Sequence, residues 1–143
     1  MPSRTVKTAP PGACDMMTSM RGVGVDIIEI ERVRGVLERR GERFIEHVFL
    51  PDETAYCRSR RHPAKHFAAR FSAKEAVVKA LGVKRGMTFL WRDIEILRSI
   101  HGEPTARLTG RALQFAAERG VTEVRVSLSH SDTHAVAMAT AGP

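Results

Sequence analysis

The chain has 143 residues and a formal net charge of +7, with 43% hydrophobic and 27% charged residues. The length predicts one domain with a modest core, and the composition is typical of water-soluble globular proteins. No apolar run approaches the roughly 20 residues that a membrane-spanning helix needs, so we expect no membrane association. The positive charge indicates a polyanionic partner: nucleic acid, anionic lipid, a phosphorylated small molecule or an acidic protein.

Nucleic acid is the first of these partners to consider. The chain has only six Phe, one Tyr and one Trp, and no run interleaves basic with aromatic residues as a single-strand stacking platform does. We therefore expect no nucleic-acid partner, although a basic nucleic-acid-binding module stays the rival hypothesis. Cys14 and Cys57 lie far apart, which matches neither a disulfide framework nor a metal site and favours a cytoplasmic protein.

The first twenty residues differ from the rest. Residues 1–20 show no hydrophobic periodicity and contain Pro10, Pro11 and Gly12, which predicts a flexible leader. They lack the apolar core of a signal peptide, so secretion is not expected. Residues 21–143 are predicted to form the single domain.

Hydrophobic periodicity predicts one strand and three helices in the next part of the chain. They cover residues 21–27, 30–40, 51–58 and about 64–81. In the strand, Val23, Val25 and Ile27 lie on one side. Gly41 and Gly82 are expected to end two of the helices.

The C-terminal half predicts strands around one helix. Residues 92–99 and 103–109 read as a hairpin turning at His101–Gly102, residues 110–120 as a helix, and residues 121–130 and 133–140 as a second hairpin. This order predicts an α+β domain with a mostly antiparallel sheet.

Asp26 stands in the middle of the predicted apolar strand. A carboxylate is costly to bury there unless it is paired or binds a metal, and Gly24 before it could let a ligand approach the backbone. The alternative is an Asp that caps the following helix. The local sequence leaves both interpretations open.

The helix at 64–81 contains FSAKEAVVKALG, residues 71–82. An apolar stripe is expected to pack it against the sheet, formed by Phe67, Phe71, Val78 and Leu81. Glu75 and Lys79 are four residues apart and share a face, so an ordinary surface ion pair is one interpretation. In the other, Asp26 and Glu75 form a minimal oxygen site for Mg²⁺, and Lys79 neutralises a departing phosphate.

The segment SLSHSDTH, residues 127–134, places Ser, His and Asp close together. We reject a catalytic triad, because neighbours on an extended chain point to opposite sides and the nucleophile-elbow pattern is absent. Ser131 and Asp132 are predicted turn residues. His130 is either part of that turn or a donor to phosphate, and a glycine-rich phosphate loop is absent.

Three segments in order resemble the 4′-phosphopantetheinyl transferases: GVGVDIIEI, RFSAKEAVVKALG and SLSHSDTHAVAMA. The middle one carries the family hallmark Trp/Phe-x-x-Lys-Glu-Ala-x-x-Lys as Phe71 to Lys79. The resemblance covers about residues 21–141 and is to the small class typified by bacterial holo-acyl-carrier-protein synthase. It implies that family's α+β fold, with a mostly antiparallel sheet packed against a long helix, assembled as a homotrimer with active sites between subunits.

The resemblance also implies a reaction. The family moves the phosphopantetheine arm of coenzyme A to a serine of an acidic apo acyl carrier protein and releases adenosine 3′,5′-bisphosphate. Asp26 and Glu75 match the carboxylates that hold Mg²⁺, and Lys79 matches a lysine that contacts the phosphates.

Three further positions match the family. Arg70 and His130 match residues that line the coenzyme A site, and Arg32 matches the centre of the helix that docks the carrier protein. The general base stays open between Glu75 and a metal-bound water. The carrier protein, of fatty-acid or polyketide synthesis, and the tolerance for acylated coenzyme A also stay open. A catalytically inactive family member is a further rival, which the intact carboxylates disfavour.

Overall fold

The structure, a computed structural model, describes residues 20–84 and 91–143. Its elements are β1 (Gly22–Glu29), α1 (Ile30–Arg40), α2 (Glu42–Val48), α3 (Pro51–Arg58), α4 (Pro63–Ala80), the 3₁₀ turn η1 (Trp91–Asp93), β2 (Ile94–Arg98), β3 (Pro104–Leu108), α5 (Gly110–Glu118), β4 (Glu123–His130) and β5 (His134–Gly142). The predicted leader, residues 1–20, lies outside the described residues except for Met20.

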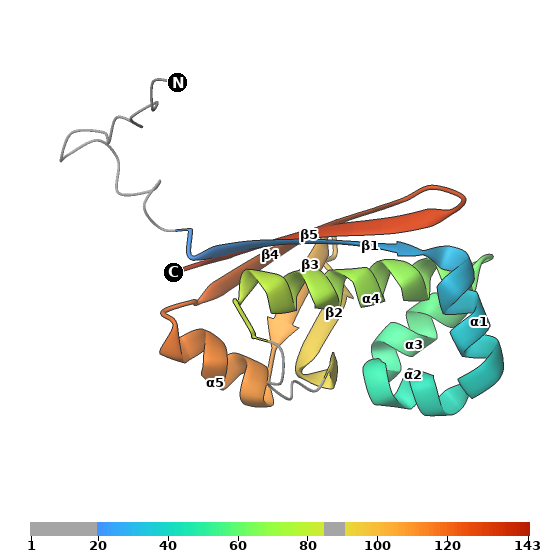
Figure 1. Ribbon diagram of the computed structural model, residues 1–143, viewed down its shortest axis with the longest axis horizontal. Coiled ribbons are helices and arrows are strands. Elements are labelled where there is room, and N and C mark those ends of the chain that lie inside the picture. Colours follow the sequence, from blue (N-terminus) through green and yellow to red (C-terminus); the bar gives the residue numbers. More distant parts are fainter. Residues whose placement is uncertain (1–19, 85–90) are drawn as a thin grey trace, which may run out of the picture.

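The described residues form two antiparallel sheets, one of three strands in the order β1-β5-β4 and one hairpin of β2 and β3. The long helix α4 runs beneath the three-stranded sheet, with α1, α2 and α3 at one end and α5 at the other (Figure 1). In the register, Asp26 on edge strand β1 faces Ala137 of β5, and His130 on the opposite edge strand β4 faces Ala135. The predicted α+β class, with an antiparallel sheet on a long helix, is confirmed.

Small residues let α4 lie very close to the sheet. The buried residues that meet between them are mostly alanines: Ala73, Ala76, Ala80, Ala137, Ala139 and Ala141. A Cβ atom on Gly24 would collide with the carbonyl oxygen of Ala76 and lie 2.7 Å from the backbone nitrogen of Ala80. The prediction that Gly24 leaves room for a ligand is therefore wrong, because the helix backbone occupies that room.

The predicted apolar stripe of α4 divides between two clusters. Val78 and Leu81 belong to the cluster with the sheet and α5, whereas Phe67 and Phe71 pack among α1, α2 and α3. This second cluster contains the helix that the sequence did not predict, α2, whose Ile45 and Val48 are buried. The helix is only seven residues long, too short for a clear periodic pattern.

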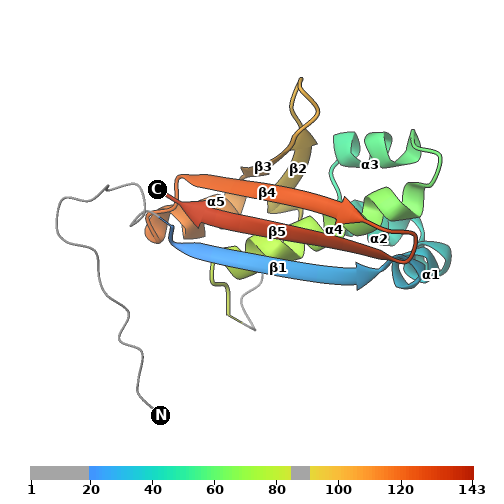
Figure 2. The same cartoon turned by 90° about the horizontal axis from the view of Figure 1, so that it is seen from above.

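The outer face of the three-stranded sheet carries exposed apolar side chains. Val23, Val25 and Ile27 of β1 are 58–65% exposed, and Met138 of β5 is 50% exposed. Seen from above, the three strands lie side by side with α4 behind them (Figure 2). Contiguous exposed apolar surface of this kind marks an interaction site in soluble proteins.

Candidate active site

Asp26 is joined to helix α4 through Lys79. The Lys79 ammonium donates to Asp26 Oδ1 at 3.1 Å and to the carbonyl oxygen of Val25 at 2.9 Å. The Asp26 side chain is 17% exposed and that of Lys79 52%, so the cation lies at the surface and the carboxylate beneath it. The capping alternative for Asp26 is wrong, since Glu29 precedes the first turn of α1.

Glu75 is held by Trp91 rather than by Lys79. The indole Nε1–H of Trp91 donates to Glu75 Oε1 at 2.6 Å, and the Trp91 ring lies 6.0 Å from the ring of Phe71. Within the described residues Lys79 pairs with Asp26, so the surface ion pair considered for Glu75 and Lys79 is wrong. Trp91 was not predicted as a partner of Glu75, although it is the only tryptophan of the chain.

Asp26 and Glu75 line one pocket of about 360 Å³, together with Arg32, Phe71 and Trp91 among others. We call this the carboxylate pocket. Each carboxylate uses one oxygen for its partner, and Asp26 Oδ2 and Glu75 Oε2 accept no hydrogen bond from the part of the chain that the structure describes. Two carboxylates with a spare oxygen each fit a hard cation such as Mg²⁺, which completes its shell with water and substrate phosphate.

The described residues contain no denser metal site that competes with this pair. Over residues 20–84 and 91–143, no group of three or more His, Cys, Asp and Glu side chains lies together in a way that could hold a metal ion. A cation in this part of the molecule would therefore depend on two protein carboxylates at most, with solvent or substrate supplying its other ligands.

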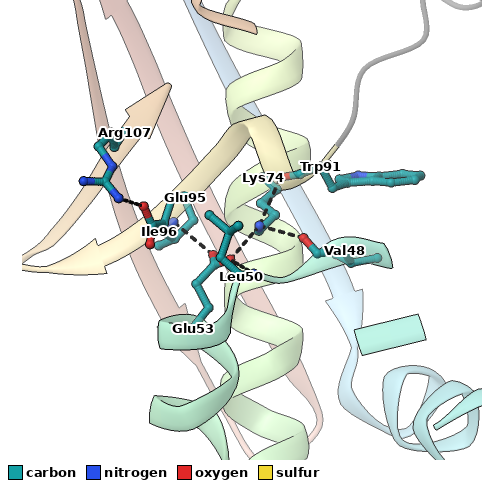
Figure 3. A network of polar contacts seen from close by, with 8 residues as sticks. All are labelled: Val48, Leu50, Glu53, Lys74, Trp91, Glu95, Ile96 and Arg107. Atoms are coloured by element: carbon teal, nitrogen blue, oxygen red, sulfur yellow. Dashed lines mark hydrogen bonds and ion pairs between the residues drawn. The ribbon is translucent and has the colours of Figure 1, made fainter. Parts of the chain in front are cut away.

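Lys74, next to Glu75 in the sequence, is fully buried. Its ammonium donates to the carbonyl oxygens of Val48 at 2.8 Å and Trp91 at 3.1 Å and to Glu53 Oε2 at 2.9 Å (Figure 3). Three acceptors around the nitrogen match the three donors of a charged lysine. Burial lowers the pKa of Lys74, and the carboxylate of Glu53 opposes that shift.

A second pocket, of about 400 Å³, contains Arg70 and His130. We call it the cationic pocket, because Arg60, Arg70 and Arg98 line it together with His66 and His130. The Arg70 guanidinium lies 4.0 Å from the centre of the Tyr56 ring. Arg70 is 4% exposed, and its buried Nε has no hydrogen-bond partner in the described residues. A buried guanidinium with a free Nε, in a pocket without acidic lining, suits an anionic ligand.

His66 and His130 meet in the cationic pocket, with ring centres 5.7 Å apart. Burial and the nearby cation of Arg60 lower the pKa of His66 to about 4. His66 is therefore neutral at neutral pH while the arginines around it are charged. Of this pocket, the sequence predicted Arg70 and His130 only, because its other members come from α3 and the turn after it, from α4, from the β2–β3 hairpin and from β4, which meet only in the fold.

The two pockets open on different sides of α4. Arg70 and Glu75 are five positions apart, so their side chains leave the helix about 140° from each other. Asp26 and His130 lie on opposite edge strands of the sheet, with β5 between them. The structure thus brings together Asp26, Glu75, Lys79 and Arg32 in one place and Arg70 and His130 in another.

The β4–β5 turn agrees with the prediction for Ser131. Its hydroxyl oxygen accepts hydrogen bonds from the backbone N–H groups of Thr133 and His134 at 3.2 and 3.1 Å. Asp132 is exposed and pairs with Lys65 of α4 at 2.7 Å, which ties the turn to the helix. His130 contributes its ring to the cationic pocket.

None of the helices among the described residues combines the length and the apolarity that a membrane crossing requires.

Comparison with known proteins gives one consistent result. Residues 22–139 match the 4′-phosphopantetheinyl transferase superfamily. The holo-[acyl-carrier-protein] synthase of Moorella thermoacetica is 48% identical over 120 residues, which cover 84% of this chain and 92% of the relative.

Solved structures agree with the sequence comparison. The holo-[acyl-carrier-protein] synthase of Helicobacter pylori in complex with coenzyme A superposes with a TM-score of 0.74 at 27% identity, covering 84% of this chain and 99% of that one. The holo-(acyl-carrier-protein) synthase of Bacillus anthracis in complex with CoA (3′,5′-ADP) gives 0.71 at 28% identity, covering 87% and 97%.

Proposed function

Because the chain belongs to the 4′-phosphopantetheinyl transferase superfamily, we propose that it moves the phosphopantetheine group of coenzyme A to a serine of an apo acyl carrier protein. It is an enzyme of the holo-[acyl-carrier-protein] synthase type. The observation that carries the proposal is the carboxylate pocket, where Asp26, Glu75 and Arg32 meet beside Lys79.

The reaction is a phosphoryl-group substitution. The serine oxygen of the carrier protein forms a bond to the phosphorus that bears the pantetheine arm. The bond from that phosphorus to the bridging oxygen breaks, and adenosine 3′,5′-bisphosphate departs with the electron pair. The serine proton passes to Glu75 or to water. Such chemistry needs positioning and neutralisation of charge more than a covalent intermediate.

Asp26 and Glu75 would hold Mg²⁺ through their spare oxygens. When bound, the ion supplies neutralisation of the pyrophosphate charge and orients the reacting groups. Lys79, half exposed above Asp26, reaches the same region with a flexible side chain. We assign to Lys79 the neutralisation of the departing phosphate. In this role its ammonium would leave Asp26 and contact the substrate phosphate instead.

The cationic pocket is assigned to the phosphates of coenzyme A. The unpaired Nε of Arg70 and the charges of Arg60 and Arg98 favour an anion there. One chain keeps this pocket apart from the carboxylate pocket, whereas a neighbouring copy can bring its cationic pocket to the carboxylate pocket of the first. Such a contact joins unlike surfaces, so it generates a ring if it closes.

We therefore propose a homotrimer with active sites between subunits. The exposed apolar side chains of β1 and β5 supply surface for such an assembly. An edge strand such as β1 also leaves backbone groups available to a neighbouring copy.

The carrier protein would dock at α1. Arg32 is exposed on this helix and lines the carboxylate pocket, so a protein bound there places its serine near the reacting groups. Further exposed cations on the same helix are Arg34, Arg39 and Arg40. They favour an acidic partner and increase its association rate. We expect a cytoplasmic carrier protein of fatty-acid synthesis, which a panel of apo carrier proteins distinguishes from one of polyketide synthesis.

The test is incubation with coenzyme A, Mg²⁺ and apo carrier protein. We expect the carrier to gain the mass of one phosphopantetheine group and adenosine 3′,5′-bisphosphate to appear in equal amount. Asp26→Ala and Glu75→Ala should abolish the mass gain while circular dichroism stays native. Near-normal turnover in both variants across a Mg²⁺ titration would refute the site. No mass gain with the unchanged chain, together with tight, salt-dependent DNA binding, would favour the nucleic-acid-binding rival.

A further inference from the structure

We propose that the buried pair Lys74–Glu53 is a positioning device for the reaction, acting through Trp91 on the Glu75 carboxylate. The proposal rests on the proposed function, because it gives Glu75 the role of a cation ligand. Neither Lys74 nor Glu53 lines the carboxylate pocket, so their effect on the chemistry has to pass through other residues. Trp91 is the residue that touches both sides.

The pair is completely enclosed and completely satisfied. Both side chains are 0% exposed. Besides Lys74, Glu53 accepts from the backbone N–H of Leu50 at 2.8 Å and of Ile96 at 3.0 Å. The pair thereby joins the start of α3, the middle of α4 and strand β2, as Figure 3 shows. A buried ion pair is weak support for stability as such, since apolar residues of similar volume often do as well. Specific positioning is a reason to retain it.

Trp91 is the point where the network reaches the carboxylate pocket. Its carbonyl oxygen accepts from Lys74 at 3.1 Å, and its indole donates to Glu75 Oε1 at 2.6 Å. In Figure 3 the carbonyl is turned toward Lys74 and the ring away from it. Residues 74 and 75 point to different sides of α4, so Lys74 holds the backbone of Trp91 on one side while Glu75 receives its ring on another.

The consequence concerns the free oxygen of Glu75. A glutamate side chain has several rotamers, and the indole bond selects those in which Oε1 meets Trp91 and Oε2 stays available. Partners that orient a ligating carboxylate are worth about 10- to 100-fold in metal affinity or activity. Without Lys74, the Trp91 backbone loses one anchor and the indole no longer has a fixed place.

Two variants test this chain of contacts. Trp91→Phe keeps an aromatic ring but removes the donor to Glu75. The double variant Lys74→Met with Glu53→Gln removes both buried charges together, so that neither is left unpaired, and with them the bond to the Trp91 carbonyl. Val77→Ala is the control for lost stability, because Val77 is buried on α4 in the cluster against the sheet.

The first readout is the binding of Mn²⁺ alone, which is monitored through the electron paramagnetic resonance signal of the free ion. This measurement needs no turnover. We expect both test variants to bind Mn²⁺ about 10- to 100-fold more weakly than the unchanged chain, and Val77→Ala to bind it within about twofold of the unchanged chain. In the double variant, the fluorescence of Trp91, the sole tryptophan, should shift to longer wavelength. In the transfer assay, the half-saturating Mg²⁺ should rise by the same factor with the KM for carrier protein unchanged.

A folded double variant with unchanged Mn²⁺ affinity and unchanged Trp91 emission overturns the proposal and leaves the pair a stabilising element only. If the double variant does not fold, Trp91→Phe decides: unchanged Mn²⁺ affinity overturns the proposal, and weakened affinity supports it. Loss of affinity in Val77→Ala as well would also overturn it. Absence of transfer activity in the unchanged chain would refute the proposed function, while the Mn²⁺ measurement would still report on the positioning of Glu75.

Discussion

Gly24→Ala is a stringent test of how α4 lies against the sheet. The new methyl group would collide with the carbonyl oxygen of Ala76 and lie 2.9 Å from Cβ of Lys79. A backbone carbonyl cannot rotate away as a side chain can, so the strand and the helix must separate. Overpacking of this kind costs about 1–3 kcal/mol, and the backbone contact favours the upper part of that range.

The matched control is Gly35→Ala on α1. There the added methyl group meets only the end of the flexible Arg39 side chain, at 2.9 Å. Within a helix, alanine is more favourable than glycine by about 0.5–1 kcal/mol. The same substitution is therefore expected to have opposite signs at the two positions.

Urea unfolding followed by circular dichroism, at one protein concentration, measures both effects. With a slope of about 2 kcal/mol per M, Gly24→Ala should lower the midpoint by about 1–1.5 M, and Gly35→Ala should raise it by about 0.3–0.5 M. Transfer activity should fall in Gly24→Ala, because the separation moves Asp26 on β1 away from Glu75 on α4, with which it lines the carboxylate pocket. A midpoint of Gly24→Ala within about 0.3 M of the unchanged chain would refute the reasoning.

Three further predictions concern partners. Arg32→Glu should raise the KM for carrier protein at least tenfold, with coenzyme A affinity unchanged by calorimetry; an unchanged KM would remove the docking argument. At pH 5, His66 is mostly neutral because its pKa is about 4, and a bound anion raises that pKa. Binding of adenosine 3′,5′-bisphosphate should therefore take up protons, seen as heats that differ between buffers, and His66→Gln should reduce the uptake; equal uptake in both proteins would contradict this. Ile27→Asp places a charge on the exposed sheet face and should shift sedimentation toward the monomer, whereas an unchanged sedimentation coefficient would exclude this face from the assembly.

Much of the architecture follows from local pattern. The helix from Ile30 to Arg40 has its predicted bounds, because its apolar spacing is regular and Gly41, at a φ of +50°, ends it. The pairing of Asp26 and Glu75 in the carboxylate pocket could also be predicted from the sequence, because the order of the motifs pointed to both residues together.

Long-range contacts could not be predicted from the sequence in the same way. The local sequence does not show that the Lys74 cation is buried, because its acceptors are Glu53, 21 residues earlier, and the carbonyl oxygens of Val48 and Trp91. The role of Gly24 depends on its contact with a helix more than fifty residues later in the chain. The role of Trp91 depends on which side of α4 its ring contacts. Local sequence contains no signal for such contacts, because they exist only once the elements have packed.

The separation of the carboxylate and cationic pockets has a consequence for inheritance. If each working site takes Glu75 from one copy and Arg70 from the next, a chain that lacks Glu75 and a chain that lacks Arg70 are damaged in different halves of the site. In mixed rings of the two, about one junction in four combines both intact halves, by random assortment around a head-to-tail ring. Two variants that are each inactive alone would then recover part of the transfer activity when they are expressed together.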